Sequence, residues 1–95
     1  MTKQTTLEIL RKKIDEIDKE LLQIIAKRID LAKQIAAKKK STGLPILDTK
    51  RWQQVLQSNI SKGVSLKLSR EFIEKLFSGI HEYTIEIEEE IYEKG

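Results

Sequence analysis

The feature that most constrains the fold of this chain is a long series of apolar residues with helical spacing. Steps of three and four residues alternate along it, which is the near-heptad spacing of a helical seam. Its members are Leu7, Leu10, Ile14, Ile17, Leu21 and Ile24, followed further along by Leu31 and Ile35. Thr6 is a suitable N-cap, and neither Gly nor Pro occurs before Gly43. The sequence therefore predicts one uninterrupted helix from about residue 6 to about residue 40.

This predicted helix is too long for a compact domain of this size. At 1.5 Å per residue it extends roughly 50 Å. A single globular domain, which is what residues 1–95 are expected to form, would be only about 30 Å across. A second copy of the chain would cover the apolar length that overshoots, so we expect a homodimer.

Two shorter helices are predicted after a loop at residues 41–45. Gly43 ends the first helix, and Pro45 prevents it from continuing. Asp48 or Thr49 can cap the second helix. Its apolar face consists of Trp52, Val55, Leu56 and Ile60.

The second helix is expected to end near Gly63, with residues 64–68 as a connector and Ser69 as the cap of the third helix. The predicted fold class is all-α: three helices, one long and two shorter, in a helical homodimer. The buried stripe of the third helix is predicted to be Ile73, Leu76, Phe77, Ile80, Ile87 and Ile91.

Composition excludes several kinds of function. The absence of Cys rules out a disulfide framework, a Cys-ligated zinc site and a thiol nucleophile. With a single His, zinc would have to be bound almost wholly by carboxylates, so no metal and no cofactor are expected. No apolar stretch approaches the roughly 20 residues of a membrane span, and residues 2–13 lack a signal-peptide core. The sequence predicts a soluble protein without membrane contacts, located in the cytoplasm.

The net charge of +3 is unevenly distributed. Residues 1–40 carry 11 Lys and Arg against 6 Asp and Glu, whereas residues 69–95 carry 3 against 8. A basic body with an acidic tail suits a small anionic ligand, but it also suits nucleic acid or solubility alone.

Two cations interrupt the apolar seam of the first helix. Arg28 stands where the next apolar residue is due, and Lys39 lies on the same face about 16 Å further along. Either their stems cover apolar surface with the charged ends in water, or they form an anion site. Two cations in register favour the anion site. Arg11 cannot join them, because it lies about 25 Å from Arg28 and is rotated by roughly 100° around the helix axis. Arg11 would be either a solvent-exposed charge on the helix surface or part of a site in a dimer partner.

Two further polar pairs are candidates for ligand contacts. Asp48 and Arg51 are neighbours in the first turn of the second helix, where an N-cap with a local ion pair explains them equally well. Thr84 and Glu88 are neighbours beside the apolar stripe of the third helix. A helical Thr can bond to the preceding turn, but Glu is rarely buried without a partner.

The remaining candidates have simpler structural explanations. His81 has no Ser or Cys nucleophile arrangement around it, and Trp52 is typical of core or dimer packing. The chain has no Gly-rich phosphate loop, metal-ligand cluster or nucleophile triad. What remains is a set of cations with one carboxyl and one hydroxyl group, which can bind a small polyanion and stabilise developing charge.

In order and spacing, these residues resemble the small all-helical chorismate mutase family. The resemblance covers nearly the whole chain, and it is carried by the segments Leu10–Asp18, Lys27-Arg28, Leu31-Ala32, Lys39, Leu44–Ile46, Asp48, Arg51, Phe77–Glu82, Thr84 and Glu88. It implies three helices, an intertwined homodimer formed through the long first helix, and conversion of chorismate to prephenate in phenylalanine and tyrosine biosynthesis. This reaction is an intramolecular Claisen rearrangement and requires no nucleophile, metal or cofactor.

The resemblance also implies a role for each polar candidate. Arg28 and the Arg11 of a second subunit would bind the two substrate carboxylates, and Lys39 the ether oxygen and a carboxylate. The remaining substrate contacts would come from Asp48 to the ring hydroxyl, Arg51 at the carboxylate end, Thr84 through its hydroxyl, and Glu88, when protonated, to the ether oxygen.

Some residues depart from the family pattern. Trp52 stands where some members have Glu, and Thr84 stands where the family usually has Ser. The residues around Trp52 and His81 resemble mutase domains fused to a deoxy-heptulosonate-phosphate synthase, so fusion to or association with such an enzyme is a further expectation.

Three alternatives to the mutase remain open. One is an isochorismate pyruvate lyase of the same fold, and another is a regulatory or dimerisation module of a shikimate-pathway enzyme. A nucleic-acid binder is disfavoured by the acidic third helix and the lack of a recognition motif. The sequence therefore favours a mutase that binds a small molecule and neither nucleic acid nor membrane.

Overall fold

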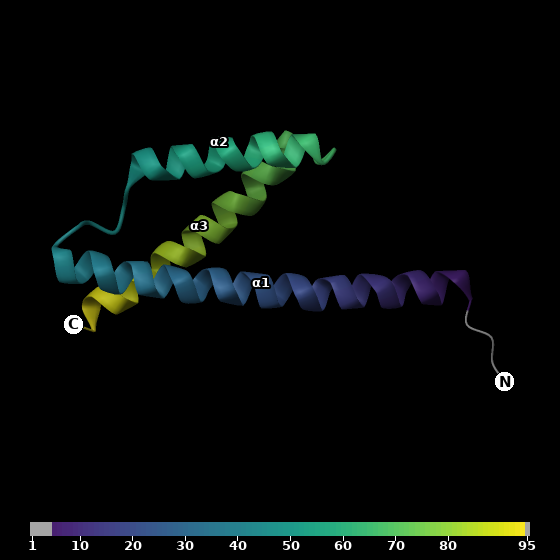
Figure 1. Cartoon of the computed structure of the whole chain (residues 1–95), viewed down its shortest axis with the longest axis horizontal. Coiled ribbons are helices and arrows are strands. Elements are labelled where there is room, and N and C mark those ends of the chain that lie inside the picture. Colours follow the sequence, from purple (N-terminus) through teal and green to yellow (C-terminus); the bar gives the residue numbers. More distant parts are fainter. Residues whose placement is uncertain (1–4, 95) are drawn as a thin grey trace. The chain divides into compact units, whose positions relative to one another are not determined.

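A computed structural model describes residues 5–94 of the chain. They form three helices, α1 (Thr6–Thr42), α2 (Thr49–Ser65) and α3 (Arg70–Glu93), and the described residues contain no strand (Figure 1). The prediction of an all-α fold with one long and two shorter helices is confirmed. The chain divides into two compact units, residues 1–31 and residues 32–95, which are described in turn.

The described part of the first unit consists of residues 6–31 of α1 and the N-cap at Thr5. Thr5 Oγ1 accepts a hydrogen bond from the Glu8 N–H at 3.1 Å, and Glu8 Oε2 accepts one from the Thr5 N–H at 3.3 Å. This reciprocal pair is a capping box, which satisfies two backbone donors that the helix leaves unpaired. The predicted N-cap, Thr6, is therefore wrong by one residue, because only Thr5 stands three residues before a Glu.

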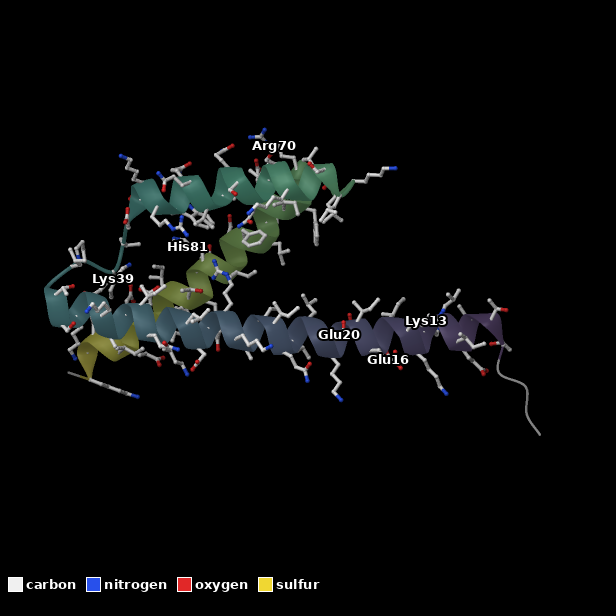
Figure 2. All side chains as sticks on the ribbon, in the orientation of Figure 1. Lys13, Glu16, Glu20, Lys39, Arg70 and His81 are labelled. Atoms are coloured by element: carbon white, nitrogen blue, oxygen red, sulfur yellow. The ribbon has the colours of Figure 1, made fainter. Side chains whose placement is uncertain are left out.

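The apolar seam of α1 is largely exposed within one chain. Figure 2 shows side chains projecting from the N-terminal half of this helix on all sides, with Lys13, Glu16 and Glu20 labelled. Every seam residue is at least half exposed: Leu7, Leu10, Ile14, Ile17, Leu21, Ile24, Leu31 and Ile35. An apolar surface of this extent is typical of a helix that packs against another protein surface.

In the second unit, α1 ends in a Schellman motif. Gly43 adopts a φ of +72°, which glycine accommodates without the steric cost of a Cβ. Its N–H donates to the carbonyl of Lys40 at 3.3 Å, and the Leu44 N–H donates to the carbonyl of Lys39 at 2.8 Å. The chain therefore turns sharply just after Lys39, which keeps the following loop close to that side chain.

The N-caps of α2 and α3 agree with the sequence. Asp48 Oδ1 accepts from the Arg51 N–H at 3.0 Å, and Ser69 Oγ accepts from the Phe72 N–H at 3.0 Å. Of the two predicted caps for α2, Asp48 is the one used, and Thr49 is the first helical residue.

The second helix ends near Gly63, as predicted, with its last helical residue at Ser65. Gly63 also has a packing role that the sequence did not indicate. Gly63 is buried against α3, and a Cβ at this position would lie 2.7 Å from Ile73 Cδ1. The missing side chain thus allows α2 and α3 to approach closely. The helix ends at a second Schellman motif, in which Lys67 adopts a φ of 66° and the Leu68 N–H donates to the Gly63 carbonyl at 3.0 Å.

The core of this unit is small. Its buried apolar side chains are Ala32 and Ala36 from α1, Ile60 from α2 and Ile73 from α3. Most of the predicted stripe of α3 is half-buried, but Leu76 is 40% exposed, because no other part of the described chain covers it.

None of the helices formed by the described residues has the length and apolar character needed to span a membrane.

The close approach at Gly63 gives a stability prediction. Gly63→Ala should lower the free energy of unfolding by about 1–3 kcal/mol, because overpacking against Ile73 exceeds the gain in helix propensity. Gly79→Ala is the matched control within α3, since nothing lies within 4 Å of an added Cβ there. The control should gain about 0.5–1 kcal/mol. Urea unfolding at fixed protein concentration measures both, and a Gly63→Ala chain as stable as wild type would contradict the packing described here.

Candidate functional site

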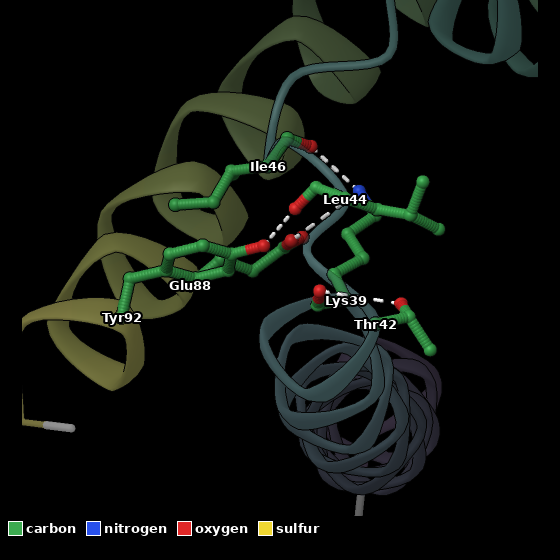
Figure 3. Close-up of polar contacts among 6 residues, drawn as sticks. All are labelled: Lys39, Thr42, Leu44, Ile46, Glu88 and Tyr92. Carbon is green, nitrogen blue, oxygen red and sulfur yellow. Dashed lines mark hydrogen bonds and ion pairs between the residues drawn. The ribbon is translucent and has the colours of Figure 1, made fainter.

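The candidate site begins with Lys39, in the last turn of α1. Its side chain is 21% exposed, and Nζ donates a hydrogen bond to the Ile46 carbonyl at 2.6 Å (Figure 3). The Schellman turn at Gly43 brings the loop back to this side chain. One proton of the ammonium group is thereby committed to the backbone, and the group keeps its positive charge for another partner.

Glu88 of α3 faces Lys39. Its side chain is only 8% exposed, and Oε2 lies 3.7 Å from Lys39 Nζ. That distance allows charge attraction but is too long for a hydrogen bond. Oε2 is buried and has no hydrogen-bond partner in the described structure (Figure 3). A buried carboxylate oxygen without a donor is costly, so this atom is suited to a ligand or to a proton.

The protonation of Glu88 is set by two opposing effects. Burial raises the pKa of Glu88 above its ordinary value, because desolvation penalises the charged carboxylate. The nearby Lys39 ammonium lowers the pKa through charge attraction, but burial is the larger effect. Glu88 is therefore a carboxyl group that holds its proton to a higher pH than an exposed Glu.

Two contacts hold the end of α3 against α1 and the loop that follows it. The Tyr92 hydroxyl donates to the Leu44 carbonyl, and Lys40 Nζ donates to the Ile91 carbonyl at 3.2 Å. Lys40 thus places a positive charge at the C-terminal turn of α3, where the helix dipole favours it. Both contacts fix the part of α3 that carries Glu88.

Thr84 is buried one turn before Glu88 on the same face of α3. Its Oγ1 donates to the Ile80 carbonyl at 2.7 Å, which is the local bond expected of a helical Thr. The hydroxyl proton of Thr84 is therefore already donated to a hydrogen bond within α3. To donate to a ligand carboxylate, Thr84 would have to rotate and give up this bond.

Asp48 and Arg51 lie at the start of α2 and are both exposed. Asp48 contacts the backbone N–H of Arg51, so the observed interaction is the N-cap rather than an ion pair with the guanidinium. This contact fixes the orientation of the first turn of α2. Five of the seven predicted site residues lie in the second unit: Lys39, Asp48, Arg51, Thr84 and Glu88. Among these five, the structure places Lys39 in contact with Glu88.

Arg11 and Arg28 belong to the first unit. Arg11 is exposed and Arg28 is half-buried. Their participation in the site therefore stays a prediction from the sequence.

The sequence interpretation missed two features near this cluster. One is the Ile46 carbonyl, which no pattern of side chains could have indicated. The other is a stack between the rings of Trp52 and His81, whose centroids are 4.0 Å apart. The spacing of His81, Thr84 and Glu88 places His81 on the same helical face as the other two residues, but it does not indicate a stack on Trp52.

The described residues around Lys39 and Glu88 do not form a metal-binding site. Within the described part of the chain, no group of three or more His, Asp or Glu side chains is placed to hold a metal ion. The chemistry available is that of a fixed ammonium group and a carboxyl group of raised pKa. Such a pair can bind an anion and donate a hydrogen bond to oxygen.

Fold and site together define a small all-helical domain in which a lysine near the end of α1 contacts a buried carboxyl group of α3. Residues 10–89 match the chorismate mutase type II family. This match spans most of the chain, which therefore belongs to that family.

Individual relatives agree with this assignment. A 73-residue alignment is 36% identical to the chorismate mutase of Methanocaldococcus jannaschii and covers 68% of this chain and 74% of that protein. All of this chain aligns at 32% identity with 24% of a bifunctional chorismate mutase/prephenate dehydratase of Enterobacter agglomerans. The T-protein of Haemophilus influenzae is 35% identical over 74 residues, which are 78% of this chain and 20% of that protein. The chain thus spans about three quarters of the first relative and a quarter or less of the other two.

The burial of Glu88 predicts an effect on stability. Because its pKa is raised in the folded state, the native chain binds this proton more tightly than the unfolded chain does. Its contribution to the free energy of unfolding should fall as pH rises from the ordinary Glu value through the folded-state pKa. Glu88→Gln removes this loss, so the variant should gain stability relative to wild type as pH increases over this range.

Urea unfolding over a series of pH values, at one protein concentration, measures this difference. Glu89→Gln is the matched control, since Glu89 is an exposed neighbour on the same helix. A stability difference between Glu88→Gln and wild type that does not change with pH would contradict the raised pKa.

Proposed function

We propose that this chain catalyses the rearrangement of chorismate to prephenate, on the route to phenylalanine and tyrosine. The observation that supports this most directly is the buried, unpaired Oε2 of Glu88 beside the Lys39 ammonium. Membership of the chorismate mutase type II family supports the same reaction.

The reaction requires a particular kind of site. A Claisen rearrangement is pericyclic: the C–O ether bond breaks as a C–C bond forms within one molecule, without a nucleophile. Catalysis then depends on holding the substrate in a compact conformation and on stabilising negative charge that builds up on the ether oxygen. A fixed cation and a neutral hydrogen-bond donor serve that purpose.

Lys39 and Glu88 are proposed to act on the ether oxygen together. The Lys39 ammonium supplies positive charge, and protonated Glu88 donates a hydrogen bond. The raised pKa of Glu88 supports this role, since an ionised carboxylate would accept rather than donate and would repel the substrate dianion. A bound dianion should raise this pKa further.

The other residues of the second unit are proposed to orient the substrate. Asp48 accepts from the ring hydroxyl, and Arg51 supports the carboxylate end. Thr84 contacts a carboxylate after its hydroxyl leaves the Ile80 carbonyl. Each of these contacts would be made to parts of the substrate that do not change bonding, so they would bind its compact conformation equally in the ground state and in the transition state.

The two arginines are proposed to complete the site across a homodimer. Arg28 of one chain and Arg11 of the partner subunit would each bind one carboxylate with a planar fork of donors. The exposed seam of α1 supports association with a second copy, because eight of its large apolar side chains are at least half exposed in one chain. Two identical sites per dimer would follow from two-fold symmetry.

Two further expectations stay predictions. One is fusion to or association with a deoxy-heptulosonate-phosphate synthase, whereas the bifunctional relative described above combines its mutase with prephenate dehydratase. The other is a cytoplasmic location. The basic test of function is the loss of chorismate in the presence of the purified chain, with isochorismate as the competing substrate that a pyruvate lyase would prefer.

The pH dependence of turnover should follow Glu88. Its protonated form is the active one, so turnover should be highest in mild acid and should fall as pH rises through the pKa of the complex. Glu88→Gln supplies a permanent donor and should flatten the profile, with a relative gain at higher pH. A wild-type profile that is flat between about pH 5 and pH 8, or a Glu88→Gln profile that keeps the original slope, would remove Glu88 from the mechanism.

The shared site predicts complementation between inactive chains. Arg11→Ala and Arg28→Ala should each be folded and inactive as homodimers. After subunit exchange in an equal mixture, half of the dimers are mixed, and each has one intact site, so activity should recover to about a quarter of wild type. Two folded, inactive variants that recover nothing after verified exchange would contradict the composite site.

A further inference from the structure

The rings of Trp52 in α2 and His81 in α3 form a stacked pair that the proposed chemistry does not use. Their centroids are 4.0 Å apart and their planes differ by 11°. Both side chains are half-buried, and Figure 2 labels His81 between the ribbons of α2 and α3. Trp52 is the only Trp of the chain. Flat ring pairs of this kind fix the separation and orientation of the two elements that carry them.

Each ring lies on the same helical face as residues of the candidate site. On α3, His81 is followed by Thr84 and Glu88, at spacings that place all three on one face. On α2, Trp52 lies one turn after Asp48, and its backbone N–H donates to the Asp48 carbonyl at 2.9 Å. The stack therefore joins the first turn of α2 to the site-bearing face of α3.

Two sets of contacts connect α3 to the start of α2, one on each side of the site. At one end, Lys39 contacts both Glu88 and the Ile46 carbonyl, two residues before the cap of α2. At the other end, Trp52 contacts His81, about 10 Å along α3 from Glu88. With the lysine contacts fixed, the separation between the start of α2 and α3 is set by the two rings.

We propose that Trp52 and His81 are a positioning pair, which holds Asp48 and Arg51 at the distance from Glu88 that the substrate requires. Neither ring has to touch the substrate for this role. The inference rests on the proposed function, in which Asp48 and Arg51 contact the ring hydroxyl and carboxylate end of chorismate.

This role has a distinctive kinetic signature. Asp48 and Arg51 are proposed to bind groups that do not react, so their contacts contribute equally in the ground state and the transition state. Loss of such contacts raises KM and leaves kcat nearly unchanged. A change at Lys39, in contrast, should lower kcat, because its charge acts on the oxygen at the breaking bond.

The test compares variants that keep a flat ring with variants that lose it. Trp52→Leu and His81→Leu should each raise KM for chorismate about fivefold, the equivalent of one lost ring stack, with little change in kcat. Trp52→Phe and His81→Phe keep a stack and should stay within about twofold of wild type. Tyr83→Leu is the matched control, because it removes an exposed aromatic side chain from the neighbouring position on α3.

A double-mutant cycle separates positioning from general damage. If the rings act only through each other, the chain with both Leu substitutions should show about the same KM as either single variant, rather than the product of both effects. Circular dichroism and thermal unfolding establish that the chains are folded. If a Leu variant does not fold, His81→Gln removes the ring with a smaller change in polarity and takes its place, with the same expected KM.

Fluorescence gives a readout that does not depend on turnover. Since Trp52 is the only Trp, its emission reports on the stack directly. Addition of a bicyclic dicarboxylate analogue of the transition state should change Trp52 emission in wild type and change it much less in His81→Leu.

The outcomes separate this inference from the function on which it rests. A wild-type chain that neither converts nor binds chorismate overturns both. An active wild type with Leu variants of unchanged KM overturns the positioning pair alone. So do additive effects in the cycle, or a His81→Phe chain as impaired as His81→Leu, since the ring nitrogens rather than the stack would then be responsible.

Discussion

The site depends on one interaction, the contact between a buried carboxyl group and a single lysine. Glu88 is removed from water, and its Oε2 receives an ion pair at 3.7 Å in place of a hydrogen bond. An ionised carboxylate in that position is poorly compensated, so the proton is held more tightly than usual. The burial of Glu88 lowers the stability of the folded chain when this carboxyl group is ionised. The same burial lets Glu88 donate a hydrogen bond at a pH where exposed Glu residues are ionised.

The surrounding structure holds Glu88 and Lys39 in this arrangement. The Schellman motif at Gly43 directs the loop so that the Ile46 carbonyl holds Lys39 Nζ. Tyr92 and Lys40 fix the last turns of α3 to the loop and to α1. Each of these three hydrogen bonds is accepted by a backbone carbonyl rather than by Glu88. Glu88 is therefore held in position while its Oε2 still lacks a hydrogen-bond donor. This arrangement suits a site that completes its hydrogen bonds with a ligand.

Much of the fold follows from local sequence signals, and the exceptions have identifiable causes. Three helices and the caps at Asp48 and Ser69 follow from apolar spacing and from side chains that accept backbone hydrogen bonds. The end of α2 near Gly63 was predictable, but the packing role of Gly63 was not, because a glycine needed for close packing looks the same in sequence as one needed for a turn. Its function depends on Ile73, which lies on another helix.

The candidate site was predictable to a similar degree. Polar residues on apolar helix faces indicated Lys39 and Glu88, because their presence there opposes the hydrophobic pattern. The Lys39–Ile46 bond and the Trp52–His81 stack depend on the path of a loop and on the crossing of two helices. Neither is encoded in the spacing of residues along one helix, so both required the structure.

The central claim is that Glu88 carries a proton when the site is occupied. Carbon-13 NMR of the Glu88 side-chain carboxyl, assigned by comparison with Glu88→Gln, measures its titration directly. The midpoint should lie above the ordinary Glu value in the free protein and should rise further when a bicyclic dicarboxylate analogue is bound. A midpoint at or below the ordinary value, or a fall on binding, would contradict this claim.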